Sequence, residues 1–374
     1  MPPPNLDRVK ISKTVTQPGD FLSVVREPNS ERLWLGHSDS KIYSIDFAQE
    51  KPAATAVFEG HESYVSGLGL IGNTLVSAGW DHKLIWWDLQ DRRVVRTVEA
   101  HDRWIRRLAV NSARTMIATI SDDMTCKLWD AKSGRLIRTL TGFDPRVPKY
   151  DNPNKIFSCA ISPDGRHVAA ADDAARVIVW ETESGREAAR FEAPSYLGIS
   201  QGGYLSASRI CCLAFSPDGK SLALAGKERA GELFVIAGPG LVQIFDWQTG
   251  QKSYEQKASG QFESIYWHPQ SSWILVAPFA NGPLCFLDPA KPRVIKETPP
   301  PPPPMTWPST KRRTRSTRSV AAKRSNGNSP RDDSLPPARE LHHENVFPLD
   351  HRRRSPGLAA RREGARTVAS RPTD

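Results

Sequence analysis

The 374-residue sequence contains no run of 18 or more apolar residues, which is the length that a membrane-spanning helix requires. Its opening residues, Met1 to Asn5, lack the charged and apolar regions of a signal peptide. The five cysteines include no Cys-x-x-Cys pair. We therefore expect a cytoplasmic protein that is not inserted in a membrane, with reduced cysteines that are mostly buried as small apolar side chains.

The net charge of +10 is distributed unevenly along the chain. Residues 299–374 hold 16 Lys and Arg against 7 Asp and Glu, which leaves 35 basic and 34 acidic residues in residues 1–298. The last stretch begins with a run of prolines, continues rich in Arg, Ser and Pro, and has few apolar residues. The sequence predicts a nearly neutral folded part, residues 1–298, followed by a basic, disordered tail, residues 299–374.

Two segments repeat the same polar pattern with a period of about 40 residues. In each, a His is followed by a hydroxyl residue, an Asp four positions later and a Trp six positions after the Asp. A blade of four short antiparallel strands joined by tight turns can bring these side chains into one hydrogen-bonded chain that buries the Trp. The two sets are His61, Ser77, Asp81 and Trp87, and His101, Thr119, Asp123 and Trp129.

This pattern resembles the structural tetrad of WD-repeat propellers. Weaker copies of the repeat begin near Phe21, Ile156, Cys211 and Ser264. The resemblance implies an all-β protein, a β-propeller of four-stranded antiparallel blades with six recognisable blades in residues 1–298. It also implies that the two polar sets are structural tetrads.

The closure of the ring has two interpretations. Residues 9–16 alternate between polar and apolar, so they are expected to form a strand that closes the ring. A seventh blade would need three more strands after Glu297, but Pro299–Pro304 and a stretch with almost no apolar residues follow. The ring therefore has six blades, or stays open where a seventh should be, or else it is a seven-blade ring whose last blade is incomplete because the C-terminus is out of frame.

Three signals of other chemistry are outweighed by structural explanations. Gly67, Gly69 and Gly72 match a dinucleotide-binding fingerprint, but that motif needs a helix directly after the glycines, and a hairpin is expected here. The histidines and aspartates occur once per repeat, as a structural tetrad requires. No nucleophile elbow accompanies the serines. We therefore expect no catalytic residue, no metal and no cofactor, and the protein is predicted not to be an enzyme.

A second set of residues is predicted to face a partner. In the propeller family, the residue three positions after the tetrad His and the residue just before the tetrad Asp lie on the narrower face. Tyr, Trp and Arg are the residue types most often found as interface anchors. The candidate partner-binding residues are Tyr64, Trp80, Arg103, Trp104 and Asp122.

Two functions follow from these features. The favoured hypothesis is a non-catalytic scaffold that binds a protein partner through the loop face of a rigid propeller. The alternative is nucleic-acid or polyanion association through basic runs of the tail such as Lys311–Arg315. The sequence does not identify the partner or the oligomeric state.

Overall fold

A computed structural model describes residues 6, 15, 19–147, 152–197, 209–228, 239–270, 272–278 and 282–298. These residues belong to one compact unit, Met1–Ser309. The strand predicted over residues 9–16, except Val15, and the tail predicted over residues 299–374 lie outside the described residues.

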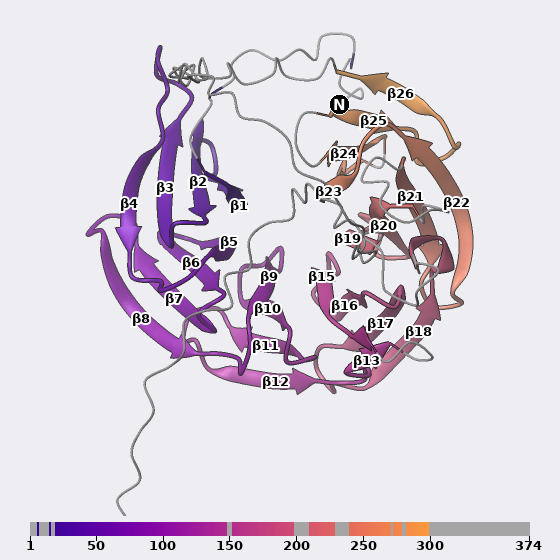
Figure 1. The fold of residues 1–374 in the computed structure, drawn as a ribbon, viewed down its shortest axis with the longest axis horizontal. Helices are drawn as coiled ribbons and strands as arrows, with labels where there is room; N and C mark the ends of the chain where they lie inside the picture. Colours follow the sequence, from indigo (N-terminus) through magenta and orange to yellow (C-terminus); the bar gives the residue numbers. More distant parts are fainter. Residues whose placement is uncertain are drawn as a thin grey trace, which may run out of the picture. The chain divides into compact units, whose positions relative to one another are not determined.

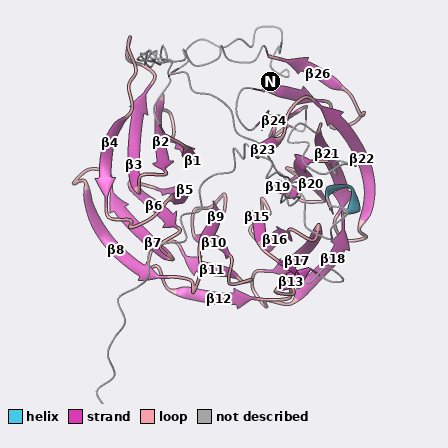
Figure 2. Ribbon diagram, viewed as in Figure 1, coloured by secondary structure: helices cyan, strands magenta, loops and turns pink. Residues whose placement is uncertain are grey.

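Six four-stranded antiparallel sheets form the blades of a β-propeller (Figures 1 and 2). Blade 1 consists of β1 (Phe21–Arg26), β2 (Arg32–His37), β3 (Lys41–Asp46) and β4 (Thr55–Glu59). Blade 2 consists of β5 (Val65–Ile71), β6 (Thr74–Gly79), β7 (Lys83–Asp88) and β8 (Arg93–Glu99). Blade 3 consists of β9 (Ile105–Val110), β10 (Met116–Ser121), β11 (Cys126–Asp130) and β12 (Leu136–Leu140).

The second half of the ring repeats this arrangement. Blade 4 consists of β15 (Ile156–Ile161), β16 (His167–Asp172), β17 (Arg176–Glu181) and β18 (Glu187–Glu192). Blade 5 consists of β19 (Arg209–Phe215), β20 (Ser221–Lys227), β21 (Gly240–Asp246) and β22 (Gln251–Ala258). Blade 6 consists of β23 (Phe262–Trp267), β24 (Ile274–Pro278), β25 (Cys285–Leu287) and β26 (Val294–Glu297). The all-β fold and the six blades expected from the repeats are thereby confirmed.

The connections add little regular structure. A two-stranded hairpin, β13 (Arg146–Val147) with β14 (Asn152–Pro153), precedes blade 4, and one 3-10 turn, Pro194–Tyr196, follows it. Within the described ranges, no helix is long and apolar enough to span a membrane.

Each of blades 2 to 5 presents an apolar face to both neighbours, because adjacent residues of a strand point to opposite faces of the sheet. The neighbours Trp86 and Trp87 on β7 show this directly. Trp87 packs in the cluster shared with blade 1, which includes Trp34, whereas Trp86 packs in the cluster shared with blade 3, which includes Trp129. Both tryptophans are almost completely buried. Burial of side chains of this size contributes a few kcal/mol each, so the interfaces between blades supply much of the stability.

The glycines of the dinucleotide-like motif serve close packing between blades. A Cβ at Gly67 would lie 2.7 Å from the Cβ of Leu108, and one at Gly69 would overlap the Cγ2 of Val110. Both contact residues belong to β9 of the next blade. Gly72 has a φ of +58° and forms the turn between β5 and β6. The spacing of these glycines therefore has a packing explanation.

Five buried apolar clusters join the six blades in sequence order, and blades 1 and 6 share none of these clusters of described residues. In Figure 1 these two blades flank the part of the circle that holds no described strand. Two polar contacts link distant parts of the ring. Arg107 on β9 forms an ion pair with Glu263 on β23 at 3.4 Å, and Lys296 on β26 donates a hydrogen bond to the carbonyl of Leu6. Leu6 thus touches the outer strand of the last blade.

Candidate functional site

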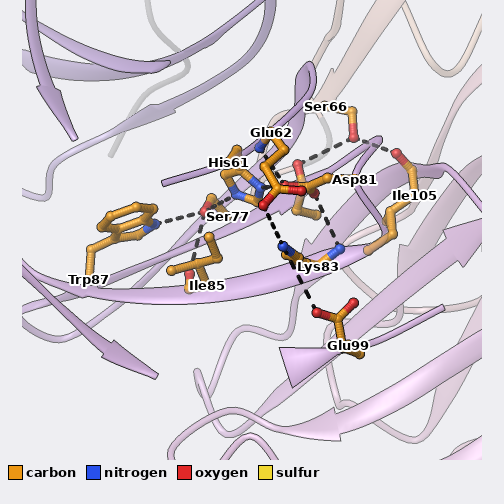
Figure 3. A network of polar contacts seen from close by, with 11 residues as sticks. His61, Glu62, Ser66, Ser77, Asp81, Lys83, Ile85, Trp87, Glu99 and Ile105 are labelled. Carbon is orange, nitrogen blue, oxygen red and sulfur yellow. Dashed lines mark hydrogen bonds and ion pairs between the residues drawn. The ribbon is translucent and has the colours of Figure 1, made fainter. Parts of the chain in front are cut away.

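Blade 2 contains a continuous hydrogen-bonded chain from Trp87 to Asp81 (Figure 3). The Trp87 Nε1 donates to Ser77 Oγ at 2.7 Å, Ser77 lies 2.7 Å from His61 Nε2, and His61 Nδ1 lies 2.8 Å from Asp81 Oδ2. Because an ionised Asp only accepts, His61 Nδ1 donates to it and Nε2 accepts the hydroxyl proton of Ser77. Every donor in the chain therefore has an acceptor.

Blade 3 repeats this chain with threonine in place of serine. Trp129 Nε1 donates to Thr119 Oγ1 at 2.9 Å, Thr119 lies 2.7 Å from His101 Nε2, and His101 Nδ1 lies 2.7 Å from Asp123. Burial alone would raise the pKa of Asp123, but its hydrogen bond and electrostatic interaction with His101, together with hydrogen bonds from Thr125, hold this pKa well below its usual value. The structure therefore brings all eight predicted tetrad residues together in two sets of four.

Blade 4 uses a different polar network. Ala174 lies six residues before Trp180, at the position of the tetrad Asp. Asp172, two residues before Ala174, is buried and accepts hydrogen bonds from Arg176 Nε and Asn154 Nδ2, each at 2.9 Å. Arg176 also contacts Asp144. An ion-pair network thus holds the turn that a tetrad holds in blades 2 and 3.

The first strand of each blade carries a β-bulge near its first residues. In blade 3, Ile105 pairs with Ser121 and Arg107 with Ile120, so Arg106 has no opposite residue. A bulge twists the strand locally and changes the direction of its extra side chain. The equivalent bulged residues of blades 1 to 6 are Leu22, Ser66, Arg106, Phe157, Cys211 and Glu263.

Three of the predicted aromatic residues form a stack at the end of the propeller where the first strands of the blades begin. The rings of Tyr64 and Trp80 have centroids 4.7 Å apart, and those of Trp80 and Trp104 lie 4.4 Å apart with planes only 6° from parallel. Tyr64 is 40% exposed, and the two tryptophans are partly exposed. The stack crosses from blade 2 to blade 3 and presents apolar surface to solvent.

Arg106 extends this stack across the next interface. Its guanidinium lies 5.0 Å from the ring centroid of Trp80, 5.2 Å from that of Trp104 and 5.4 Å from that of Phe157. It also donates two hydrogen bonds to Asp122, at 2.7 and 2.6 Å. A paired, planar cation of this kind holds the rings in fixed positions.

A second arginine ends the array in blade 5. The guanidinium of Arg209 lies 4.2 Å from the centroid of Phe157. The stacked array therefore runs through four consecutive blades, and we name it the aromatic–arginine ladder. The ladder consists of Tyr64, Trp80, Trp104, Arg106, Phe157 and Arg209.

The sequence prediction and the structure differ in which arginines contribute. Arg103 is exposed, and its backbone carbonyl accepts a hydrogen bond from Ser121. Arg106 is the arginine that joins the predicted Trp80, Trp104 and Asp122. It is the extra residue of the β9 bulge, so the alternation of the strand could not have indicated its direction. Finding Phe157 and Arg209 required the pairing register of blades 4 and 5.

An acidic residue with a raised pKa lies beside the ladder. The register places Asp173 at the position that Trp80 holds in blade 2 and Asp122 in blade 3. Burial raises the pKa of Asp173 to about 6, opposed by the positive charges of Arg209, Lys155 and Arg106 and reinforced by the negative charge of Asp172. Within the described ranges, no group of three or more His, Cys, Asp or Glu residues is arranged to hold a metal ion.

Comparison with known proteins identifies the repeats. The family described as WD domain, G-beta repeat matches residues 51–88, 92–130 and 135–181. The chain is 39% identical over 33% of its length to the F-box/WD repeat-containing protein sel-10 of Caenorhabditis elegans. It is 30% identical over 50% of its length to eukaryotic translation initiation factor 3 subunit I of Bombyx mori, and 26% identical over 55% to the transcriptional corepressor LEUNIG_HOMOLOG of Arabidopsis thaliana.

These matches cover 21%, 54% and 27% of the three relatives, respectively, so the chain spans about half of their length or less. Each matched repeat begins with the outer strand of one blade and ends with the third strand of the next, so the three repeats supply the first three strands of blades 2, 3 and 4. The first two repeats contain the complete tetrads. With its six four-stranded blades and WD repeats matched within residues 51–181, this chain is similar to the WD-repeat β-propellers.

Proposed function

We propose that this protein is a non-catalytic scaffold that binds a protein partner through the ladder end of its propeller. The observation that carries the proposal is the aromatic–arginine ladder, in which partly exposed rings are fixed by stacking and by the Arg106–Asp122 pair. Pre-ordered aromatic side chains lose little conformational entropy when a partner covers them, and Trp, Tyr and Arg dominate binding energy at protein interfaces.

The family supports a role in protein interaction. WD-repeat propellers generally mediate such interactions. One relative is named as a subunit of translation initiation factor 3, and another as an F-box protein. Their names describe those proteins, and for this chain they support the scaffold role without specifying a partner.

Affinity capture from nuclease-treated native lysate tests the proposal. The bait proteins are the full chain, the double variant Trp80→Ala/Trp104→Ala and the control Tyr266→Ala, which removes a 50% exposed aromatic residue from β23 away from the ladder. The proposal expects a protein captured by the wild type and the control and lost with the double variant. Equal capture by all three baits contradicts it.

The alternative function, nucleic-acid or polyanion association, is favoured by the excess of 16 basic over 7 acidic residues in residues 299–374. It predicts capture that survives the tryptophan substitutions, disappears with nuclease or with deletion of residues 299–374, and weakens steeply as salt increases. Repeating the capture without nuclease, and with a bait that lacks residues 299–374, therefore separates the two functions.

We also propose a cytoplasmic location. It is supported by the five cysteines, Cys126, Cys159, Cys211, Cys212 and Cys285, which are all free and buried or half-buried. Fluorescence microscopy of the tagged full chain tests the location, and a nuclear or secreted signal would contradict it.

A further inference from the structure

The two arginines of the ladder differ in their partners. Arg106 donates two hydrogen bonds to the carboxylate of Asp122. Arg209 makes a cation–π contact with Phe157, but its buried Nε has no hydrogen-bond partner among the described residues. In contrast to Arg106, Arg209 has no carboxylate hydrogen-bonded to it among the described residues, so its charge can pair with an external anion.

Positive charge is in excess around Arg209. Lys227 on β20 pairs directly with Arg209 on β19. Lys155 precedes Ile156, the first residue of β15 in the neighbouring blade 4. The pKa of Lys227 is lowered by burial and by the nearby charge of Arg209, as expected for cations held close together. Asp173 interacts electrostatically with Arg209, Lys155 and Arg106, and burial disfavours its ionised form. The blade 5 end of the ladder is therefore a cationic site beside an aromatic one.

We propose that the blade 5 end of the ladder is a carboxylate-binding subsite, in which Arg209 receives an Asp or Glu side chain of a partner peptide. The partner's neighbouring apolar side chain covers the Trp80–Trp104 stack. This inference rests on the proposed function, because it names the chemistry of the partner at the same face. The basic tail, with 16 Lys and Arg, does not complement this site.

A carboxylate fits the site better than a phosphate does. The second arginine, Arg106, already satisfies Asp122. A dianionic phosphate would need more donors than the guanidinium of Arg209 alone supplies, whereas one guanidinium is enough for a monoanionic carboxylate.

Peptide selection on the full-length protein tests the subsite. Short random peptides displayed on phage are selected against the immobilised wild type, and the most enriched peptide is synthesised as selected, with Asp and Glu replaced by Asn and Gln, and with phosphoserine at those positions. The inference expects enrichment of Asp or Glu beside an apolar residue, and binding of the acidic peptide at least about tenfold tighter than binding of its neutral form.

Variants then locate the interaction. Arg209→Gln should abolish the difference between the acidic and neutral peptides, whereas Trp80→Ala should weaken both by the same factor. Arg96→Gln is the matched control, because Arg96 also lies over a tryptophan, 5.9 Å from Trp86, but on the outer strand β8. It should leave all affinities unchanged. Thermal unfolding of each variant verifies that it is folded.

Several outcomes overturn the inference. They are the absence of any selected peptide, no enrichment of acidic residues, equal weakening of both peptides by Arg209→Gln, and tighter binding of the phosphoserine form. Binding of single-stranded DNA that is lost with Arg209→Gln overturns it as well. If Trp80→Ala still removes peptide binding or partner capture in these cases, the proposed scaffold function stands and only the carboxylate subsite is wrong.

Discussion

Trp80 and Trp104 stack in parallel across the boundary of two blades, with ring centroids 4.4 Å apart. Each ring is attached to a tetrad: Trp80 directly precedes Asp81, and Trp104 follows His101 by three residues. The buried hydrogen-bonded chains therefore fix the two turns that carry the stack. This links the structural part of each repeat to the exposed part, because a loosened tetrad would displace a ladder residue.

The stack should couple blades 2 and 3 energetically. We expect Trp80→Ala and Trp104→Ala to have non-additive effects on the free energy of unfolding, with a coupling of about 0.5–1.5 kcal/mol. Urea denaturation of the wild type, both single variants and the double variant measures this coupling. In the same cycle with Tyr266→Ala in place of Trp80→Ala, the two effects on the free energy of unfolding should be additive within about 0.5 kcal/mol. Zero coupling between Trp80 and Trp104 would contradict the prediction.

The hydroxyl of Ser77 should be essential to its tetrad. Ser77→Ala removes the acceptor of Trp87 Nε1 and the donor to His61 in a fully buried position, which should lower the free energy of unfolding by about 1–3 kcal/mol. Chemical denaturation measures the change. The exposed Ser133→Ala, which removes a hydroxyl that bonds Asp130, should cost no more than about 0.5 kcal/mol. Equal effects of the two substitutions would show that the chain contributes little.

The raised pKa of Asp173 predicts a specific pH dependence. Because its pKa is about 6 in the folded protein and about 3.9 when unfolded, the folded state binds more protons between pH 4 and 6, and stability falls as the pH rises through that window. Asp173→Asn should therefore stabilise the protein by about 1–3 kcal/mol above pH 6 and by nothing below pH 4.

Denaturation curves of wild type and Asp173→Asn between pH 4 and 7.5 measure this difference. Asp218→Asn is a control of opposite sign, since a hydrogen bond from Ser216 lowers the pKa of Asp218 and its ionised form is the stabilising one. A difference for Asp173→Asn that does not change with pH would contradict the assignment.

The sequence predicted the fold well because the repeat is local. The hydroxyl residue, the Asp and the Trp, at spacings of four and six, lie within one hairpin of two adjacent strands and their turn. Their spacing alone therefore indicates that they are close together. Blade 4 shows the limit of this reasoning. Ala174 occupies its Asp position, and the replacement contact of Asp172 with Asn154 comes from a connection whose path depends on tertiary packing.

The candidate site was predicted only in part, because its contacts cross between blades. Trp80 and Trp104 could be named from their places in the repeat, but the choice between Arg103 and Arg106 depends on which residue the bulge turns toward the stack. Arg209 and Phe157 belong to repeats whose polar pattern has diverged, so their register could not be read from the sequence.

The dissociation constant of the captured partner, measured by calorimetry for the wild type and for Trp104→Ala, tests the central claim most directly. Trp104 stacks on Trp80 and lies beneath Arg106, so its removal should weaken binding by about 30-fold or more, the effect of an interface hot spot, without loss of the folded state. An affinity within about twofold of the wild type would show that the partner binds elsewhere, and the ladder would not be the recognition surface.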